Sequence, residues 1–174
     1  MFTIINSMEI AQRVIDFGAL VIAGFVRDVY IRKEERFNDI DIICEIHKRD
    51  NFLEYLNGEF VRTTIPNSSN VPLCRLIDIV YIRRTKLEIM YYDTLEDWKC
   101  KESTVDCTHS LFYLSKNGLH IQYLPEGYTQ EELLDLILQK KFKYLDERLT
   151  TNEKILKNIE RSYHFQMRGW KLVF

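Results

Sequence analysis

The sequence predicts a mixed α/β domain followed by two helices, and three observations support this prediction. Short apolar runs of strand length alternate with segments of helical periodicity up to about residue 125. After Pro125 the pattern becomes helical. The 174 residues are 46% apolar with only six Gly and three Pro, which suits a packed core and excludes collagen-like or disordered chains. We therefore expect a head over residues 1–125 and a helical extension over residues 126–174.

The elements of the head are predicted from caps, periodicity and turn residues. Asn6 can cap a helix that Gly18 ends, and the apolar run that follows suits a strand buried on both faces. Asn117 and Gly118 form a typical hairpin turn. The elements expected in chain order are a helix over 6–17, a strand over 19–23, a short helix over 26–30, a strand over 40–46, a helix over 50–56, strands over 76–82 and 87–92, and a hairpin of 111–114 with 119–123.

Two capping boxes predict the helices of the extension. Thr129 stands three residues before Glu132, and Thr150 stands three residues before Glu153. Apolar residues at helical spacing follow each box. They are Leu133, Leu136 and Ile137 in the first helix, and Ile155, Ile159 and Tyr163 in the second.

Charge is divided unevenly along the chain. The 24 basic and 26 acidic residues give a net charge of −2, which excludes a protein that holds nucleic acid by overall charge. Residues 139–174 hold nine Lys or Arg and four Asp or Glu, a net +5, whereas the first 138 residues carry −7. An acidic body with a basic tail is a first indication of a local nucleic-acid or phosphate surface.

The cysteines and the N-terminus indicate an intracellular protein. Four cysteines without CxxC spacing and without histidines at zinc-finger distance are expected to be buried, reduced thiols. The first residues show no basic n-region, and no window approaches 18 uncharged apolar residues, so we expect no signal peptide and no membrane partner. The expected location is the cytoplasm.

A pair of carboxylates carries the strongest chemical signal. Asp39 and Asp41 open a predicted strand, where residues two apart point the same way. Two acids side by side raise each other's pKa unless a cation such as Mg²⁺ neutralises them. Gly24, at the end of the preceding strand, lets a phosphate approach the backbone, and the following helix offers N–H donors. The alternative is an ordinary solvated acidic strand edge, because such pairs are common in charged chains.

These residues resemble a known family. The run Val21-Ile22-Ala23-Gly24-Phe25-Val26-Arg27-Asp28, followed after a loop by Asp39-Ile40-Asp41, is similar to the G-G-x-V-R-D and D-x-D signature of the polymerase-beta-type nucleotidyltransferase superfamily. The head domain of CCA-adding enzymes and bacterial poly(A) polymerases is the nearest branch. The resemblance implies a mixed-sheet nucleotidyltransferase head flanked by helices and followed by a short helical neck.

The resemblance also implies a set of site residues. Asp39, Asp41 and Glu88 would be catalytic and would hold two Mg²⁺ ions, with Mn²⁺ as an alternative and Asp78 as the reserve third ligand. The implied nucleotide-binding residues are Ala23, Gly24, Arg27, Asp106, Lys154, Lys157 and Arg161. A salt bridge to Asp28 or Asp39 is the alternative for Arg27, and a solvated helix face is the alternative for the last three.

The chain departs from the family pattern at three places. Ala23 replaces the first glycine of the pair, Thr104 and Val105 replace paired arginines before Asp106, and Lys154 alone could stand in for the element that reads the incoming base.

The implied activity is metal-dependent transfer of a nucleotide from a nucleoside triphosphate to an acceptor hydroxyl, with release of pyrophosphate. An RNA 3′ end is the favoured acceptor. Two alternatives stay open: a minimal transferase that modifies a protein or small molecule, and an inactive nucleotide- or RNA-binding module.

Overall fold

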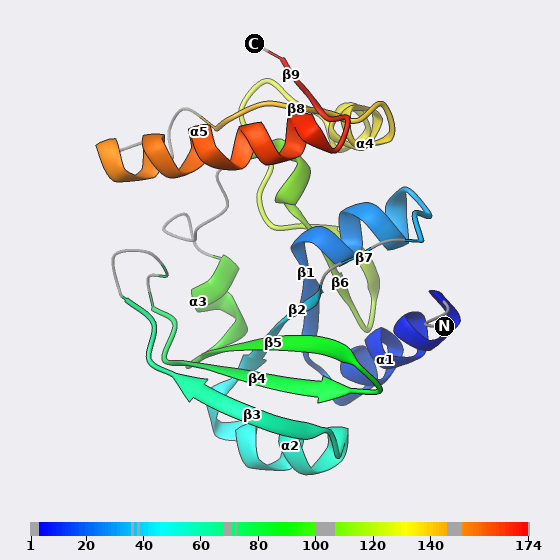
Figure 1. Cartoon of the computed structure of the whole chain (residues 1–174), viewed down its shortest axis with the longest axis vertical. Coiled ribbons are helices and arrows are strands. Elements are labelled where there is room, and N and C mark those ends of the chain that lie inside the picture. The colour runs from blue at the N-terminus through cyan, green and yellow to red at the C-terminus, as the bar shows by residue number, and fades with distance from the viewer. Residues whose placement is uncertain are drawn as a thin grey trace.

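A seven-stranded mixed sheet forms the centre of the molecule (Figure 1). The computed structural model describes residues 4–35, 37, 39–67, 71, 73–99, 107–145 and 151–173. The strand order is β3-β4-β5-β2-β1-β6-β7, in which β2 and β5 run parallel and the other neighbouring pairs run antiparallel. The strands are β1 (Leu20–Ile22), β2 (Asp39–Glu45), β3 (Glu59–Thr64), β4 (Leu76–Ile82), β5 (Thr85–Tyr92), β6 (Phe112–Ser115) and β7 (Gly118–Ile121).

Helices flank this sheet, and a small second sheet follows it in the chain. The helices are α1 (Ile4–Phe17), the π-helix η1 (Phe25–Ile31), η2 (Ile46–Lys48), α2 (Arg49–Leu56), α3 (Leu95–Lys99), η3 (Thr108–Ser110), α4 (Gln130–Leu138) and α5 (Asn152–Met167). β8 (Lys141–Phe142) and β9 (Lys171–Leu172) pair in parallel. None of the helices in the described ranges is long and apolar enough to cross a membrane.

The predicted fold class is confirmed, with differences in detail. The expected strands and helices of the head are present, while β3, α3 and the β8–β9 pair were not predicted. All six residues of β3 are exposed, so this edge strand lacks the half-buried alternation that marks a strand in sequence. The short η1 helix at the predicted place is a π-helix, a rare form that is often found near functional sites.

The two faces of the sheet carry different residues. Ile40 and Ile42 of β2, with Leu87 and Ile89 of β5, point into the main core, where side chains of α1 and α2 cover them. The residues between them point to the opposite face. There a smaller apolar cluster that contains Ile22, Ile43, Tyr92, Trp98 and Tyr113 lies on the side of the sheet that carries Asp41.

The segment that follows residue 125 shares its core with the head. Leu133, Ile137, Phe142 and Trp170 belong to the same buried cluster as Val26 of η1. In Figure 1 this segment, coloured yellow to red, lies at the end of the molecule opposite α2. The division into a head and a neck-like extension stays a prediction, since both sides of residue 125 contribute to one core.

The predicted helix α5 is present, and a polar side of it is buried. Asn158 and Ser162 form its buried side, with 2% and 7% of their surface exposed, whereas Ile155, Ile159 and Tyr163 are 39%, 60% and 63% exposed. The apolar residues of this helix therefore lie on its exposed side. Tertiary contacts set the orientation instead: the Tyr144 hydroxyl donates to the Asn158 carbonyl, and Phe165 packs on His109 and Phe142.

Candidate active site

Three carboxylates meet at the start of two parallel strands. In the β2–β5 register Asp41 lies opposite Glu88, and Asp39 lies opposite Lys86. Residues two apart in a strand share a face, so all four side chains emerge on the same side of the sheet. One oxygen from each of Asp39, Asp41 and Glu88 can be chosen so that all three lie within 4.8 Å of one another. The structure therefore brings together the three predicted metal ligands.

The electrostatics of this carboxylate cluster favour a bound cation. Burial, followed by the charges of Asp39 and Glu88, raises the pKa of the Asp41 carboxyl to about 7. The Nζ atom of Lys86 lies 3.5 Å from Asp39 Oδ2 and 3.6 Å from Glu88 Oε2, which neutralises part of the negative charge. Three carboxylates with one ammonium leave an excess of negative charge, and hard oxygen donors of this kind suit Mg²⁺ or Mn²⁺.

Asp78, the reserve ligand, lies on the opposite face of the sheet. It is fully buried, and it accepts hydrogen bonds from Arg49 at 2.8 and 3.0 Å and from the Thr63 hydroxyl at 2.5 Å. Burial alone would raise the pKa of Asp78, but these hydrogen bonds outweigh burial and lower it. Asp78 thus belongs to a buried ion pair of the main core and does not join the carboxylate cluster.

The turn beside the cluster has an unusual backbone at Ala23. Its φ of 57° lies in the left-handed region that favours glycine, whereas Gly24 has right-handed helical angles of −57° and −41°. The residue that takes the place of the family's first glycine is therefore the one whose conformation calls for glycine. The alanine at this position therefore strains the backbone.

Ala23→Gly is expected to stabilise the protein by about 1 kcal/mol. Glycine removes a left-handed strain of roughly 1–2 kcal/mol, which is partly offset by the greater entropy of the unfolded chain. Urea unfolding followed by circular dichroism measures the change. Ala19→Gly is the matched control, because Ala19 is buried without positive φ, and this change should destabilise the fold by about 1 kcal/mol. Destabilisation by both substitutions would contradict the prediction.

Arg27, a predicted phosphate ligand, forms a buried ion pair with Asp28. Its Nε and Nη2 atoms donate to the two carboxylate oxygens at 2.7 and 2.8 Å, and both residues are at most 5% exposed. The guanidinium also lies over the rings of Phe165 and Trp170, 5.1 and 5.3 Å from their centroids. The salt-bridge alternative for Arg27 is therefore present in the structure.

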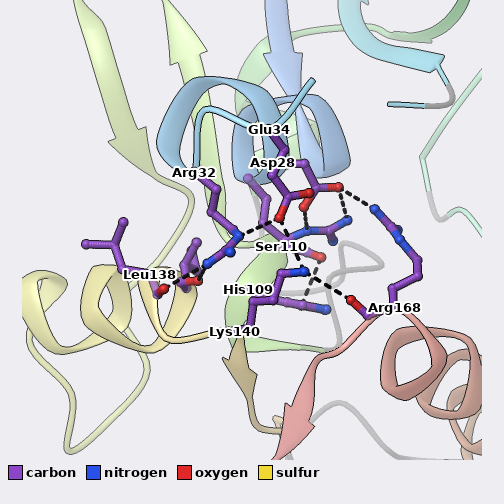
Figure 2. A network of polar contacts seen from close by, with 10 residues as sticks. Asp28, Arg32, Glu34, His109, Ser110, Leu138, Lys140 and Arg168 are labelled. Carbon is purple, nitrogen blue, oxygen red and sulfur yellow. Dashed lines mark hydrogen bonds and ion pairs between the residues drawn. The ribbon is translucent and has the colours of Figure 1, made fainter. Parts of the chain in front are cut away.

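Asp28 also binds Arg168 from the end of the chain, as Figure 2 shows. The Arg168 Nη2 atom donates to Asp28 Oδ2 at 2.9 Å. Burial would raise the pKa of Asp28, but the hydrogen bonds and charges of Arg27 and Arg168 outweigh burial and lower it. This carboxylate thus joins η1 to the segment that follows α5.

A cavity of about 270 Å³ connects the carboxylate cluster with α5. The turn at Ala23 and Gly24 and the carboxylates of β2 line one side. Arg161, Phe165 and Arg168, at i, i+4 and i+7 spacing, line the other side. The cavity thus places acids suited to a cation opposite bases suited to phosphate.

Most of the predicted site residues border this cavity. The predicted residues in its lining are Ala23, Gly24, Arg27, Asp39, Asp41 and Arg161. Glu88 is not in the lining, but it lies in the carboxylate cluster with Asp39 and Asp41. Lys157 is exposed on α5 and is not part of the lining. Asp106 and the side chain of Lys154 lie outside the described part of the chain.

Sequence reasoning missed Lys86, Phe165 and Arg168. For Phe165 and Arg168, the helical spacing from Arg161 was the available signal. Lys86 falls between the strands expected over 76–82 and 87–92, and only the strand register locates it beside Asp39.

Comparisons with known proteins find similarity in structure only. No family model matches the chain, and no curated protein is detectably similar to it in sequence. The CCA-adding enzyme of Bacillus stearothermophilus in complex with CTP is 16% identical, with a TM-score of 0.58 over 99% of this chain and 42% of that one. The Thermotoga maritima CCA-adding enzyme complexed with tRNA is 17% identical, with a TM-score of 0.60 over 95% of this chain and 38% of that one.

A third solved structure agrees with these two. A CCA-adding enzyme in complex with ATP is 18% identical, with a TM-score of 0.60 over 98% of this chain and 39% of that one. The chain therefore spans about two fifths of the length of these enzymes. The structural neighbours confirm the resemblance found in the sequence at the level of the fold: the chain shares the fold of the matched part of these CCA-adding enzymes.

Proposed function

We propose that the chain is a metal-dependent nucleotidyltransferase that moves a nucleotide from a nucleoside triphosphate to an acceptor hydroxyl. The observation that carries the proposal is the convergence of Asp39, Asp41 and Glu88 beside a cavity whose far side presents Arg161 and Arg168. The shared fold supports it, because the neighbouring structures are CCA-adding enzymes with CTP or ATP bound.

The carboxylate cluster would hold the divalent ions of this reaction, Mg²⁺ or Mn²⁺. The residues fit such ions because their carboxylate oxygens converge. In addition, Asp41 is held next to the negative charges of Asp39 and Glu88, which a cation would neutralise. When bound, the ions would lower the pKa of the acceptor hydroxyl and neutralise the triphosphate. Arg161 and Arg168 would contact phosphate oxygens from the opposite side of the cavity, and Gly24 would leave room for them beside the turn.

The reaction would proceed as a substitution at phosphorus. The acceptor oxygen forms a bond to the α-phosphorus and gives its proton to solvent. The bond from that phosphorus to the oxygen bridging to the β-phosphate breaks, and pyrophosphate leaves with the electron pair. Most of the rate would come from positioning and charge neutralisation.

An RNA 3′ end is the acceptor that we propose. The net +5 charge of residues 139–174 favours an anionic polymer, and one neighbouring CCA-adding enzyme is complexed with tRNA. A protein or small-molecule hydroxyl is the second candidate acceptor.

Labelled nucleotides would test the activity and the acceptor together. The protein is incubated with each of the four α-labelled nucleoside triphosphates and Mg²⁺, in one arm with tRNA and short RNAs and in the other with RNase-treated cell lysate. Labelled RNA supports the favoured acceptor, and labelled protein or small molecule supports the second. No labelled acceptor, together with no triphosphate binding by calorimetry, would contradict the proposal.

Gly24→Ala is expected to impair nucleotide use without harming the fold. A Cβ at Gly24 would meet only Arg27 Nη2, at the ordinary contact distance of 3.5 Å, and the backbone there is right-handed helical. The added methyl would, however, crowd a phosphate beside the turn. We expect the KM for the triphosphate to rise about tenfold, the equivalent of about one charged hydrogen bond, with the Tm unchanged or raised. An unchanged KM would remove Gly24 from the nucleotide site.

A further inference from the structure

Lys86 occupies a central position in the carboxylate cluster. It lies opposite Asp39 in the β2–β5 register and two residues before Glu88 on β5, so backbone geometry directs its side chain toward both acids. Its Nζ atom lies 3.5 and 3.6 Å from one oxygen of each. The side chain is 33% exposed, so water screens the charges only in part.

Other lysines of the described chain form simpler ion pairs. Lys48, Lys99 and Lys140 each lie near one carboxylate, at 3.2 to 3.4 Å. Lys86 contacts two, and both belong to the cluster that is suited to a divalent ion.

We propose that Lys86 is a built-in counter-ion of the carboxylate cluster, which limits the nucleotide-free protein to one divalent ion. Three carboxylates carry −3, and Lys86 with one divalent ion supplies +3, so the cluster is then neutral. A second divalent ion must displace the ammonium or arrive together with the negative charge of a triphosphate. This inference rests on the proposed function, in which Asp39, Asp41 and Glu88 hold divalent ions.

Lys86→Gln is expected to tighten metal binding about tenfold and to allow a second ion. Removing a unit charge a few ångströms from a divalent ion changes its affinity by about that factor. The test is a Mn²⁺ titration of the nucleotide-free protein, with free Mn²⁺ followed by electron paramagnetic resonance. Lys86→Arg keeps the charge and should bind like the wild type. Lys48→Gln is the matched control, because that side chain is 39% exposed and pairs with Glu45 away from the cluster.

Each outcome of the titration decides the proposal. Tighter binding or a second ion in Lys86→Gln alone supports it, and so does Mn²⁺ binding that appears only in that variant. If the wild type binds Mn²⁺, Asp41→Asn abolishes this binding and Lys86→Gln leaves it unchanged, then the proposal for Lys86 is overturned and the proposed function is not. No Mn²⁺ binding by any variant overturns both. If Lys86→Gln is unstable without metal, Mn²⁺ should raise its Tm more than that of the wild type, and an equal rise counts against the proposal.

Discussion

Asp41→Asn is expected to abolish Mg²⁺-dependent nucleotide transfer and, at the same time, to stabilise the metal-free protein. Losing this ligand removes several kcal/mol of charge stabilisation, equivalent to about a 10³-fold lower rate. Without metal, however, the Asp41 carboxylate is held near Asp39 and Glu88 at a cost in stability. A neutral amide of the same shape should raise the free energy of unfolding by about 1 kcal/mol, as measured by urea unfolding in EDTA.

The pH dependence of stability gives an independent readout of the same carboxyl group. The pKa of Asp41 is raised from 3.8 to about 7, so between these values the folded protein keeps a proton that the unfolded chain releases. The free energy of unfolding in EDTA should therefore fall as the pH rises through this range, and this contribution should be absent in Asp41→Asn. Glu96→Gln is the control, since that side chain is 81% exposed and lies outside the cluster. A variant that keeps full activity, or that is less stable than the wild type in EDTA, would contradict the assignment.

The carboxylate cluster could be predicted because most of it follows from residues that are close together in the sequence. The two-residue period of a strand places Asp39 and Asp41 on one face, and the family resemblance adds Glu88. The main strands were predictable for a similar reason, since buried runs such as residues 40–46 are recognised from composition alone. The structure then supplies the parallel β2–β5 pairing that brings Glu88 opposite Asp41.

Features that depend on contacts between distant segments could not be predicted. The position of Lys86 depends on the register between β2 and β5. A shift of one residue would turn its side chain to the opposite face of the sheet. The orientation of α5 follows from the contacts of Asn158 and Phe165 and not from its apolar period, so its apolar residues are exposed. The left-handed backbone at Ala23 is likewise imposed by its surroundings, because alanine gives no local preference for it.

A salt bridge between Asp28 and Arg27 could be predicted, but the contact of Asp28 with Arg168 could not. Its carboxylate joins Arg27, which is adjacent in sequence, to Arg168, which is 140 residues away. Around it, Arg32 donates to the carbonyls of Ile137 and Leu138, so the same region of η1 is tied to α4 (Figure 2). These contacts join the head to the segment after residue 125, which explains why the two share one core.

Asp28→Ala is expected to destabilise the protein by about 3–5 kcal/mol. The substitution leaves the Arg27 guanidinium buried without its bidentate partner, and an uncompensated buried charge costs about that much. The difference from the wild type should shrink as the pH falls below 3.8. The pKa of Asp28 is lowered by its arginine partners, against burial, so its contribution is present above that value and lost in acid. Urea unfolding at neutral pH and in acid measures both effects.

Two further variants separate the buried charge from ion pairing in general. Asp93→Ala breaks the Arg75–Asp93 pair, in which both side chains are more than half exposed, and should cost well under 1 kcal/mol. Arg168→Ala removes the half-exposed partner of Asp28 but leaves Arg27 in place, so its cost should lie between the other two. If Asp28→Ala cost no more than Asp93→Ala, Arg27 would have to find another partner or reach water in that variant, and the ion pair would not be what holds it. A cost of about 3–5 kcal/mol would instead support Arg27 as the fixed, buried partner of Asp28.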